Sequence, residues 1–399
     1  MSEKIFPIAG IKLATIYAGI RKKPQDDLLL IALDEQTSTA AVFTRNAFCA
    51  APVVVARTHL KKMSPRYLLI NAGNANAGTG KQGHDDALAC CQWLADIAGC
   101  HRSEVLPFST GVIGEPLPTE KFAKVLPKVF QALSEAHWSQ ASQAIMTTDT
   151  VAKVVSRRQE INGKQITVTG MAKGSGMIRP DMATMLAYIA TDAAINPNVL
   201  QQCLNKSVNH SFNRITVDGD TSTNDACVLM ATGKGELAIS STDEADYVAF
   251  QHLIQHVCED LARMIVKDGE GATKLINILV EGGQTEQECL DVAYTIAHSP
   301  LVKTAFFASD PNWGRILAAV GRAGLTQLDL EAINIYLDDV CIVEQGGRSK
   351  QYTEARGQTV MSQDEITIKV QLGRGTVNAT LWTCDFSYDY VRINAEYRT

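Results

Sequence analysis

The segment 173–186 contains a threonine whose type and position suit covalent chemistry. It is rich in glycine and proline, reads Ala183-Thr184 near its end, and leads directly into a strand-like run. If the chain were cut before Thr184, the new α-amine would lie beside that residue's own hydroxyl. An α-amine has a pKa of about 7.7–8.0, so it can accept the hydroxyl proton near neutral pH without a histidine. The pattern therefore suggests an N-terminal nucleophile, but a structural threonine that begins a strand would look the same.

Two glycine-containing segments have the composition to bind negative charge. Thr110 precedes Gly111, and a glycine N–H that no side chain obstructs suits an oxyanion hole, although an ordinary turn has the same sequence. The loop 71–80 follows an apolar strand and precedes a helix, where backbone N–H groups can face an anion. Its repeated asparagine and glycine suit a structural turn equally well, because both residues adopt left-handed conformations. The residues alone leave both alternatives open for both segments.

Other motifs that carry chemistry are absent from the sequence. It has no G-x-S-x-G elbow, no H-E-x-x-H, no Walker A and no G-x-G-x-x-G after a strand. His252 and His256 lie four residues apart on an expected helix, but no third ligand accompanies them, so we expect a polar helix face. Glu270 lies close to Lys267 and Lys274, and the residues alone favour a turn position for it.

The composition excludes several classes of protein. The 399 residues are 46% hydrophobic and 20% charged, which excludes a disordered or fibrous chain. The net charge of −6 argues against nucleic-acid binding, which requires a basic surface. We expect the basic run 21–23 to lie on a solvated face. The first 30 residues lack the pattern of a signal peptide, and no window reaches the ~18 apolar residues of a membrane span.

The cysteines indicate a reducing compartment. Ten are scattered along the chain without a C-x-x-C motif, and Cys91, Cys203 and Cys258 occupy apolar positions of helix-like stretches. This distribution predicts reduced, buried thiols and neither disulfides nor a zinc site. We therefore expect a soluble cytoplasmic protein that binds neither nucleic acid nor membrane.

Short apolar runs alternate with stretches of helical spacing. Strands are expected at 28–33, 53–55, 67–70 and 185–191, and helices at 85–98, after an Asn196 cap with Pro197, and at 242–267. Strand-like segments then follow one another at 275–280, 333–343, 365–372 and 376–386. This order predicts an α/β protein with α+β character, because consecutive hairpin-type strands form antiparallel sheet. Glycine and proline in 171–184 predict a junction between structural units there.

Seven blocks of the sequence follow the order found in one family of acyltransferases. They are 71–80, 109–114, 173–186, 217–225, 267–274, 309–315 and 394–399. The chain thereby resembles the ornithine acetyltransferase family, also called glutamate N-acetyltransferase, of arginine biosynthesis. The agreement covers nearly all of the chain, and its departures are small: Asp181 stands where the family usually has asparagine.

The resemblance implies an N-terminal-nucleophile-like fold of sheets packed with helices, in a precursor that cuts itself. Thr184 would attack the carbonyl of Ala183, and hydrolysis of the resulting ester would give an alpha chain, 1–183, and a beta chain, 184–399. The alpha chain would carry the oxyanion segment, and the beta chain would begin with the nucleophile. The two chains would stay associated, and the family forms heterotetramers.

The implied reaction moves an acetyl group from N2-acetylornithine to glutamate through an acetyl-Thr184 intermediate. Thr110 and Gly111 would stabilise the oxyanion. The residues at the family's substrate-contacting positions are Thr147, Lys173, Thr184, Glu270, Asn394 and Thr399. Lys173 suits the α-carboxylate of either substrate, and Glu270 or the C-terminal carboxylate of Thr399 suits the δ-ammonium of acetylornithine. No metal or bound organic cofactor is implied, and acetyl-CoA as a second acetyl donor is left open.

Two alternatives remain at this point. An N-terminal-nucleophile amidase or aminopeptidase would share the nucleophile but pass its acyl group to water. A non-enzymatic binding protein would keep the fold, but the presence of Thr184 with Thr110 and Gly111 argues against it.

Overall fold

The computed structural model describes residues 4–179 and 185–396. The chain divides into two compact units. The first is formed by the residues up to Asn213 together with Asp220–Ile265, and the second by Arg214–Gly219 and the residues from Val266 onward. The sequence predicts a junction between units at 171–184, and this prediction is wrong. Lys173 pairs with Leu186 in an antiparallel ladder, so this segment joins two neighbouring strands of one sheet.

The first unit contains a four-stranded sheet that is buried on both faces. Its strands, in the order β1-β2-β4-β5, are β1 (Ile11–Ile16), β2 (Leu28–Leu33), β4 (Tyr67–Asn74) and β5 (Val105–Val112). Leu28 and Leu30 pack under helices α2 (Gly80–Ala98) and α3 (Thr119–Gln131), whereas Leu29 and Ile31 face the opposite way. Because successive side chains of a strand alternate between faces, a strand covered on both sides reads as a continuous apolar run.

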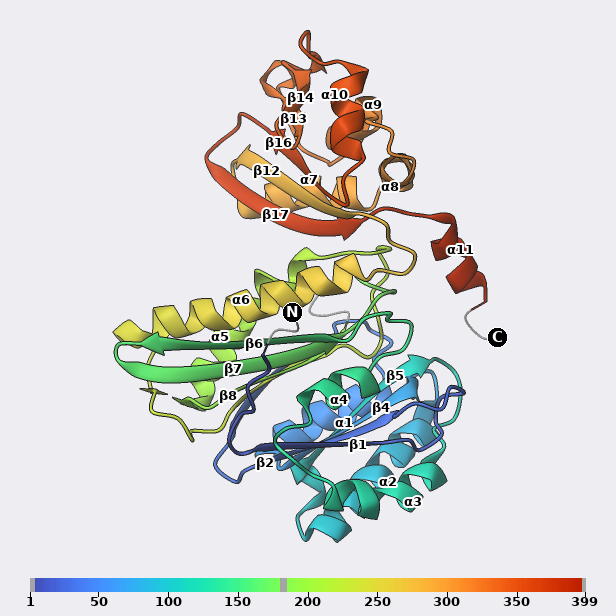
Figure 1. Cartoon of the computed structure of the whole chain (residues 1–399), viewed down its shortest axis with the longest axis vertical. Coiled ribbons are helices and arrows are strands. Elements are labelled where there is room, and N and C mark those ends of the chain that lie inside the picture. Colours follow the sequence, from blue (N-terminus) through green and yellow to red (C-terminus); the bar gives the residue numbers. More distant parts are fainter. Residues whose placement is uncertain (1–3, 180–184, 397–399) are drawn as a thin grey trace. The chain divides into compact units, whose positions relative to one another are not determined.

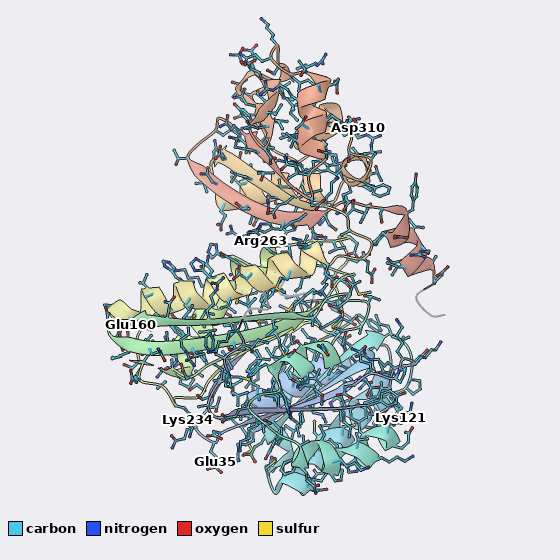
Figure 2. The ribbon with its side chains drawn as sticks, viewed as in Figure 1. Glu35, Lys121, Glu160, Lys234, Arg263 and Asp310 are labelled. Carbon is cyan, nitrogen blue, oxygen red and sulfur yellow. The ribbon has the colours of Figure 1, made fainter. Side chains whose placement is uncertain are left out.

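A five-stranded sheet faces the first one. Its order is β3-β10-β8-β7-β6, with β3 (Ser38–Phe43), β10 (Ala226–Ala231), β8 (Leu186–Thr191), β7 (Lys164–Lys173) and β6 (Lys153–Ile161). Tyr188 and Val228 from this sheet join Leu29 and Phe108 from the other in one hydrophobic core. Figure 2 shows side chains filling the layer between the sheets, while the charged Glu35 lies at the periphery.

Helices cover the outer faces of both sheets, so the first unit has four layers (Figure 1). Outside the five-stranded sheet lie α5 (Pro197–Asn209) and α6 (Ala245–Lys267). Gly170 of β7 leaves room for Val257 and Leu261 of α6, and the Asn196 side chain caps α5 by accepting from Asn198 N. The remaining elements of the unit are α1 (Ala51–Leu60), α4 (Trp138–Ala144), β9 (Ala194–Ile195) and β11 (Ala238–Ile239).

The second unit is a mixed six-stranded sheet with helices. The sheet order is β15-β14-β13-β16-β12-β17, with β12 (Leu275–Gly283), β13 (Asn334–Leu337), β14 (Val340–Glu344), β15 (Gly347–Arg348), β16 (Glu365–Gln371) and β17 (Val377–Cys384). The helices are α7 (Glu286–Ala297), α8 (Pro300–Phe307), α9 (Trp313–Gly321), α10 (Glu354–Met361) and α11 (Tyr388–Ala395). The predicted strand 333–343 is a hairpin, with Asp338 in a left-handed conformation between β13 and β14.

The expected α/β class with α+β character is confirmed, and one predicted element is wrong. Val53–55 was expected as a strand but lies in α1, because Pro52 suits the first turn of a helix and the buried Pro52, Ala56 and His59 recur at helical spacing. Cys91, Cys203 and Cys258 are buried free thiols, as predicted. Among the described residues, no helix is long and apolar enough to span a bilayer.

Candidate active site

Gly111 occupies a position in β5 that only glycine fits. Its φ is +135°, and a Cβ added there would lie 2.3 Å from the carbonyl carbon of Gly73 in β4. Gly73 itself has φ +113°. A side chain at Gly111 would clash with backbone, which cannot move aside without disrupting the β4–β5 pairing. The Thr110-Gly111 pair therefore lies in the last part of a buried strand, not in the isolated turn that was the alternative.

Asparagines in the last part of β4 and just after it hold this strand pair together. Asn71 accepts from Ser109 Oγ at 2.6 Å and donates to Asn74 O at 2.8 Å. Asn74 accepts from Asn76 N, and Asn76 donates to Gly83 O in α2. The side-chain amides of the loop 71–80 are thus bonded within the protein. The asparagine side chains therefore have a structural role in the loop.

A further asparagine, Asn224, lies just before β10 and binds β5. Its Nδ2 donates to Ser109 O at 2.9 Å and to Ala75 O at 2.6 Å, and its Oδ1 accepts from Thr223 Oγ1. Sequence reasoning placed the block 217–225 in the family order but gave Asn224 no role. Its position is set by contacts more than 100 residues apart in the sequence, which no local pattern reveals.

Three of the predicted site residues meet at the ammonium group of Lys173. Its Nζ donates to Thr147 Oγ1 at 2.9 Å and to Thr110 Oγ1 at 3.3 Å. Lys173 ends β7 and is 8% exposed, so its charge lies in a mostly desolvated position. A buried cation beside two hydroxyl groups is suited to bind a carboxylate. The structure therefore brings together Thr110, Thr147 and Lys173, which the family resemblance selected.

Asp149 is the centre of this cluster, and sequence reasoning missed it. Its carboxylate accepts from Lys153 Nζ at 2.7 Å, from Thr147 N and from Gly174 N, and lies 3.9 Å from Lys173 Nζ. Burial alone would disfavour the carboxylate, but Lys173 and Lys153 outweigh it and lower the pKa of Asp149 to about 2. Asp149 is therefore ionised at neutral pH and fixes both Thr147 and the end of β7. The available sequence signal was the i,i+4 spacing of Asp149 and Lys153.

Arg21 corrects the expectation that the basic run 21–23 lies on a solvated face. Lys22 and Lys23 are exposed, but the Arg21 guanidinium donates to Ala144 O and Met146 O, each at 2.8 Å. These carbonyls immediately precede Thr147. Arg21 thus holds the segment that presents Thr147, because a guanidinium has several donors in one plane and can bind two carbonyls at once.

Asp225 is a second buried carboxyl group near the site. It is 3% exposed, and its Oδ2 has no hydrogen-bond partner among the described residues. Burial raises the pKa of Asp225 well above its ordinary value, and Ser222 and Lys173 oppose this only in part. The neighbouring Ala226 N donates to Met185 O, so Asp225 lies where β10 begins beside the start of β8.

In the second unit, Glu270 and Asn394 contact each other. Asn394 of α11 donates from Nδ2 to Glu270 Oε2 at 2.9 Å, and Glu270 is 7% exposed. Two residues that the family resemblance selected, 124 positions apart, are therefore a bonded pair. Ala183, Thr184 and Thr399 lie outside the described residues. Within the described ranges, no group of three or more His, Cys, Asp or Glu residues could hold a metal ion.

Comparison with known proteins agrees with the resemblance. The model of the ArgJ family matches residues 12–399. "Arginine biosynthesis bifunctional protein ArgJ" of Methylococcus capsulatus is 59% identical over 396 residues, which cover 99% of this chain and 97% of that protein. The protein of the same name from Pseudomonas fluorescens is 53% identical over 396 residues, covering 99% and 98%.

A solved structure of the bifunctional ArgJ protein from Bacillus halodurans is 42% identical in sequence; it covers 51% of this chain and 95% of its own, with a TM-score of 0.49. The family match extends over almost the whole sequence and includes every described site residue. The chain belongs to the ArgJ family, and it is an enzyme of arginine biosynthesis, an acyltransferase, as its sequence predicts.

Proposed function

We propose that this enzyme transfers the acetyl group of N2-acetylornithine to glutamate, giving ornithine and N-acetylglutamate. The observation that carries the proposal is the buried Lys173 ammonium group, hydrogen-bonded to Thr110 and Thr147 and charge-balanced by Asp149. Both substrates carry an α-carboxylate, and this cluster offers a cation and hydroxyl groups to bind it. Family membership and the arginine-biosynthesis relatives support the substrate class.

The nucleophile arises by self-cleavage in this proposal. The Thr184 hydroxyl attacks the carbonyl carbon of Ala183, the C–N bond breaks as the C–O bond forms, and the hydroxyl proton ends on the new α-amine. Water then hydrolyses the ester, leaving the chains 1–183 and 184–399. The freed amine is close in pKa to neutral pH and serves as the base for its own hydroxyl.

Acetyl transfer then follows a ping-pong course. The Thr184 hydroxyl attacks the acetyl carbonyl of acetylornithine, ornithine leaves, and the glutamate amine attacks the acetyl-threonine ester. Thr110 and Gly111 stabilise the oxyanion in each step, and the loss of one such donor typically costs about 10²–10³ in rate. Glu270 supplies the negative charge that the δ-ammonium of acetylornithine requires, with the Thr399 carboxylate as the other candidate.

Three further properties belong to the same proposal. The hydroxyl, amine and oxyanion donors suffice for acyl transfer, so the reaction needs no metal and no bound organic cofactor. The relatives are named bifunctional, which supports acetyl-CoA as a second acetyl donor for glutamate. We also propose a cytoplasmic enzyme in which the two cleaved chains assemble as a heterotetramer. Membership of an enzyme family sets the non-enzymatic alternative aside.

Intact-mass spectrometry of the purified protein tests the first step. Wild type should give two species, the second beginning at Thr184, and the Thr184→Ala variant should give one full-length chain. Thr380→Ala, in another Ala-Thr pair of the sequence, is the matched control and should be cut like wild type. A wild type that stays intact would contradict the mechanism at its start.

Product analysis tests the second step. Acetylornithine with glutamate should give N-acetylglutamate, and the Thr184→Ala variant should give none. Release of acetate at the same rate with and without glutamate would show that water accepts the acetyl group, as in an amidase. Replacing acetylornithine by acetyl-CoA tests the second activity in the same assay.

A further inference from the structure

The turn that carries Glu270 belongs to neither of the elements that flank it. Helix α6 ends at Lys267 and strand β12 begins at Leu275. The buried carboxylate of Asp385, directly after β17, binds this turn. Its Oδ1 accepts from Thr273 N at 2.8 Å and from Lys274 N at 2.9 Å, and its Oδ2 accepts from Thr273 Oγ1 at 2.6 Å. Three hydrogen bonds to one fully buried carboxylate fix the C-terminal part of the turn.

The middle of the same turn is attached to the start of α11. Ser387 donates from Oγ to Gly271 O at 2.6 Å, and the same oxygen caps α11 by accepting from Asp389 N and Tyr390 N. Gly271 has φ +68°, and a Cβ there would lie 2.5 Å from Tyr390 N. The side chains of Asp385 and Ser387 therefore fix both the turn and the start of the helix that carries Asn394.

The buried amine of Lys303 interacts electrostatically with Asp385. Lys303 of α8 is fully buried and donates to Thr383 Oγ1 at 2.9 Å and to Cys384 O. Burial lowers the pKa of Lys303, and the neighbouring groups Cys384, Asp385 and Asp218 oppose that shift. The electrostatic attraction between Lys303 and Asp385 offsets part of the cost of burying the carboxylate.

We propose that Asp385 is the positioning residue of Glu270: it holds the turn 269–274 so that the Glu270 carboxylate meets Asn394 and is presented to the δ-ammonium of the acetyl donor. The inference rests on the role proposed above for Glu270. It predicts an asymmetry between substrates, because acetylornithine has a δ-ammonium whereas glutamate has a carboxylate at the corresponding end. Misplacing Glu270 therefore weakens binding of the donor and spares the acceptor.

Steady-state kinetics with both substrates tests the proposal in the complete enzyme, with both chains of the proposed cleavage present. Asp385→Asn keeps the size of the side chain but removes its charge. We expect the KM for acetylornithine to rise about 10-fold and the KM for glutamate to change less than about twofold, as for Glu270→Gln. In the Glu270→Gln background, Asp385→Asn should raise the KM for acetylornithine by a further factor of less than about two, because both changes act through one carboxylate.

A matched control and a milder variant separate positioning from folding. Asp338 also binds backbone, accepting from Thr367 N at 2.8 Å in the β13–β14 turn, and Asp338→Asn should leave both KM values unchanged. Thr273→Val removes one of the three hydrogen bonds to Asp385 and should raise the KM for acetylornithine by a smaller factor. Thr273→Ser keeps the hydroxyl group and should have the wild-type KM.

Two results would overturn the inference. One such result is an equal rise in both KM values. The other is a donor KM in the double variant with Glu270→Gln that equals the product of the two single effects. Either would mean that Asp385 acts through the stability of the whole unit. An unchanged donor KM in Glu270→Gln would instead remove the proposed role of Glu270. That outcome is recognisable on its own, since it does not depend on any change at Asp385.

Discussion

The carboxylate of Asp149 and the ammonium group of Lys153 form a buried ion pair at 2.7 Å, with neither side chain more than 1% exposed. A pair in this position is stabilising only while both partners are present, because removal of one leaves an uncompensated charge in a desolvated site. The same carboxylate also accepts from Thr147 N and Gly174 N. Loss of Asp149 should therefore affect both stability and the geometry of the site.

We expect Asp149→Asn to lower the free energy of unfolding by about 3–5 kcal/mol, measured by urea denaturation at pH 7. Asp34→Asn is the matched control, since Asp34 pairs with Lys234 at 2.9 Å on the surface and should cost less than about 1 kcal/mol. The double variant Asp149→Asn with Lys153→Met should recover part of the loss. Similar costs for the buried and surface variants would contradict this account.

Substitution of Gly111 by alanine should abolish activity. The new Cβ would lie 2.3 Å from Gly73 C and 2.5 Å from Asn74 N, and both are backbone atoms that cannot rotate away. We expect kcat to fall at least about 10²-fold, in line with the loss of an oxyanion donor, together with a lower Tm. Gly114→Ala is the comparison, because a Cβ at Gly114 meets nothing within 4 Å, although its φ is +85°. If Gly111→Ala has the activity of Gly114→Ala, the close approach to β4 is not required.

Lys173→Met should weaken the binding of both proposed substrates, acetylornithine and glutamate. Each carries an α-carboxylate, and a hydrogen bond to a charged group typically contributes about 1.5–3 kcal/mol, so both KM values should rise about 10–100-fold. This pattern differs from the one expected for Glu270→Gln, which concerns the donor alone. Steady-state kinetics with each substrate varied in turn distinguishes the two. A rise confined to one substrate would contradict the role of Lys173.

Asp225→Asn should make the stability of the protein less dependent on pH. Folded Asp225 keeps its proton above the ordinary pKa of 3.8, whereas unfolded Asp225 loses it. The stability that this group contributes is therefore complete below pH 3.8 and is lost as pH rises toward the folded pKa, at about 1.4 kcal/mol per pH unit. Asparagine has no proton to lose, so the stability of the variant relative to wild type should increase between pH 4 and neutrality.

Urea midpoints of both proteins across this pH range measure the effect. A constant difference between wild type and Asp225→Asn would show that the carboxyl group does not retain its proton in the folded state.

The sequence predicted those parts of the fold whose signals are local. Strand β2 is buried on both faces and so reads as a continuous apolar run, and α5 begins at an Asn-Pro pair that caps a helix. Val53–55 misled because three valines are too few to show a period, and the helical spacing of their buried neighbours decides the structure. Local patterns thus predicted most helices and strands but not how these elements pack against one another.

The candidate site also combines residues that the sequence revealed with residues that only the folded structure reveals. The family resemblance gave Thr110, Thr147, Lys173, Glu270 and Asn394, and the structure forms two bonded groups from them. Arg21 was expected in solvent because nothing near it in the sequence shows that Ala144 O lies 123 positions away at its guanidinium. Asn224 and Asp385 were missed for the same reason, since their partners lie more than 100 positions away in the sequence. Asp149 was missed although its partners Thr147 and Lys153 are close in sequence.

The strand order of the five-stranded sheet has a consequence for how the mature enzyme can form. Strands β3, β6 and β7 precede residue 183, whereas β8 and β10 follow residue 184, and the order β3-β10-β8-β7-β6 places β10 between strands of both origins. A fragment ending at residue 183 or starting at 184 would expose unpaired strand edges, which promote aggregation. If the chain is cut between residues 183 and 184 as proposed, folding must come before cutting, and two halves synthesised separately would depend on each other's concentration to fold at all.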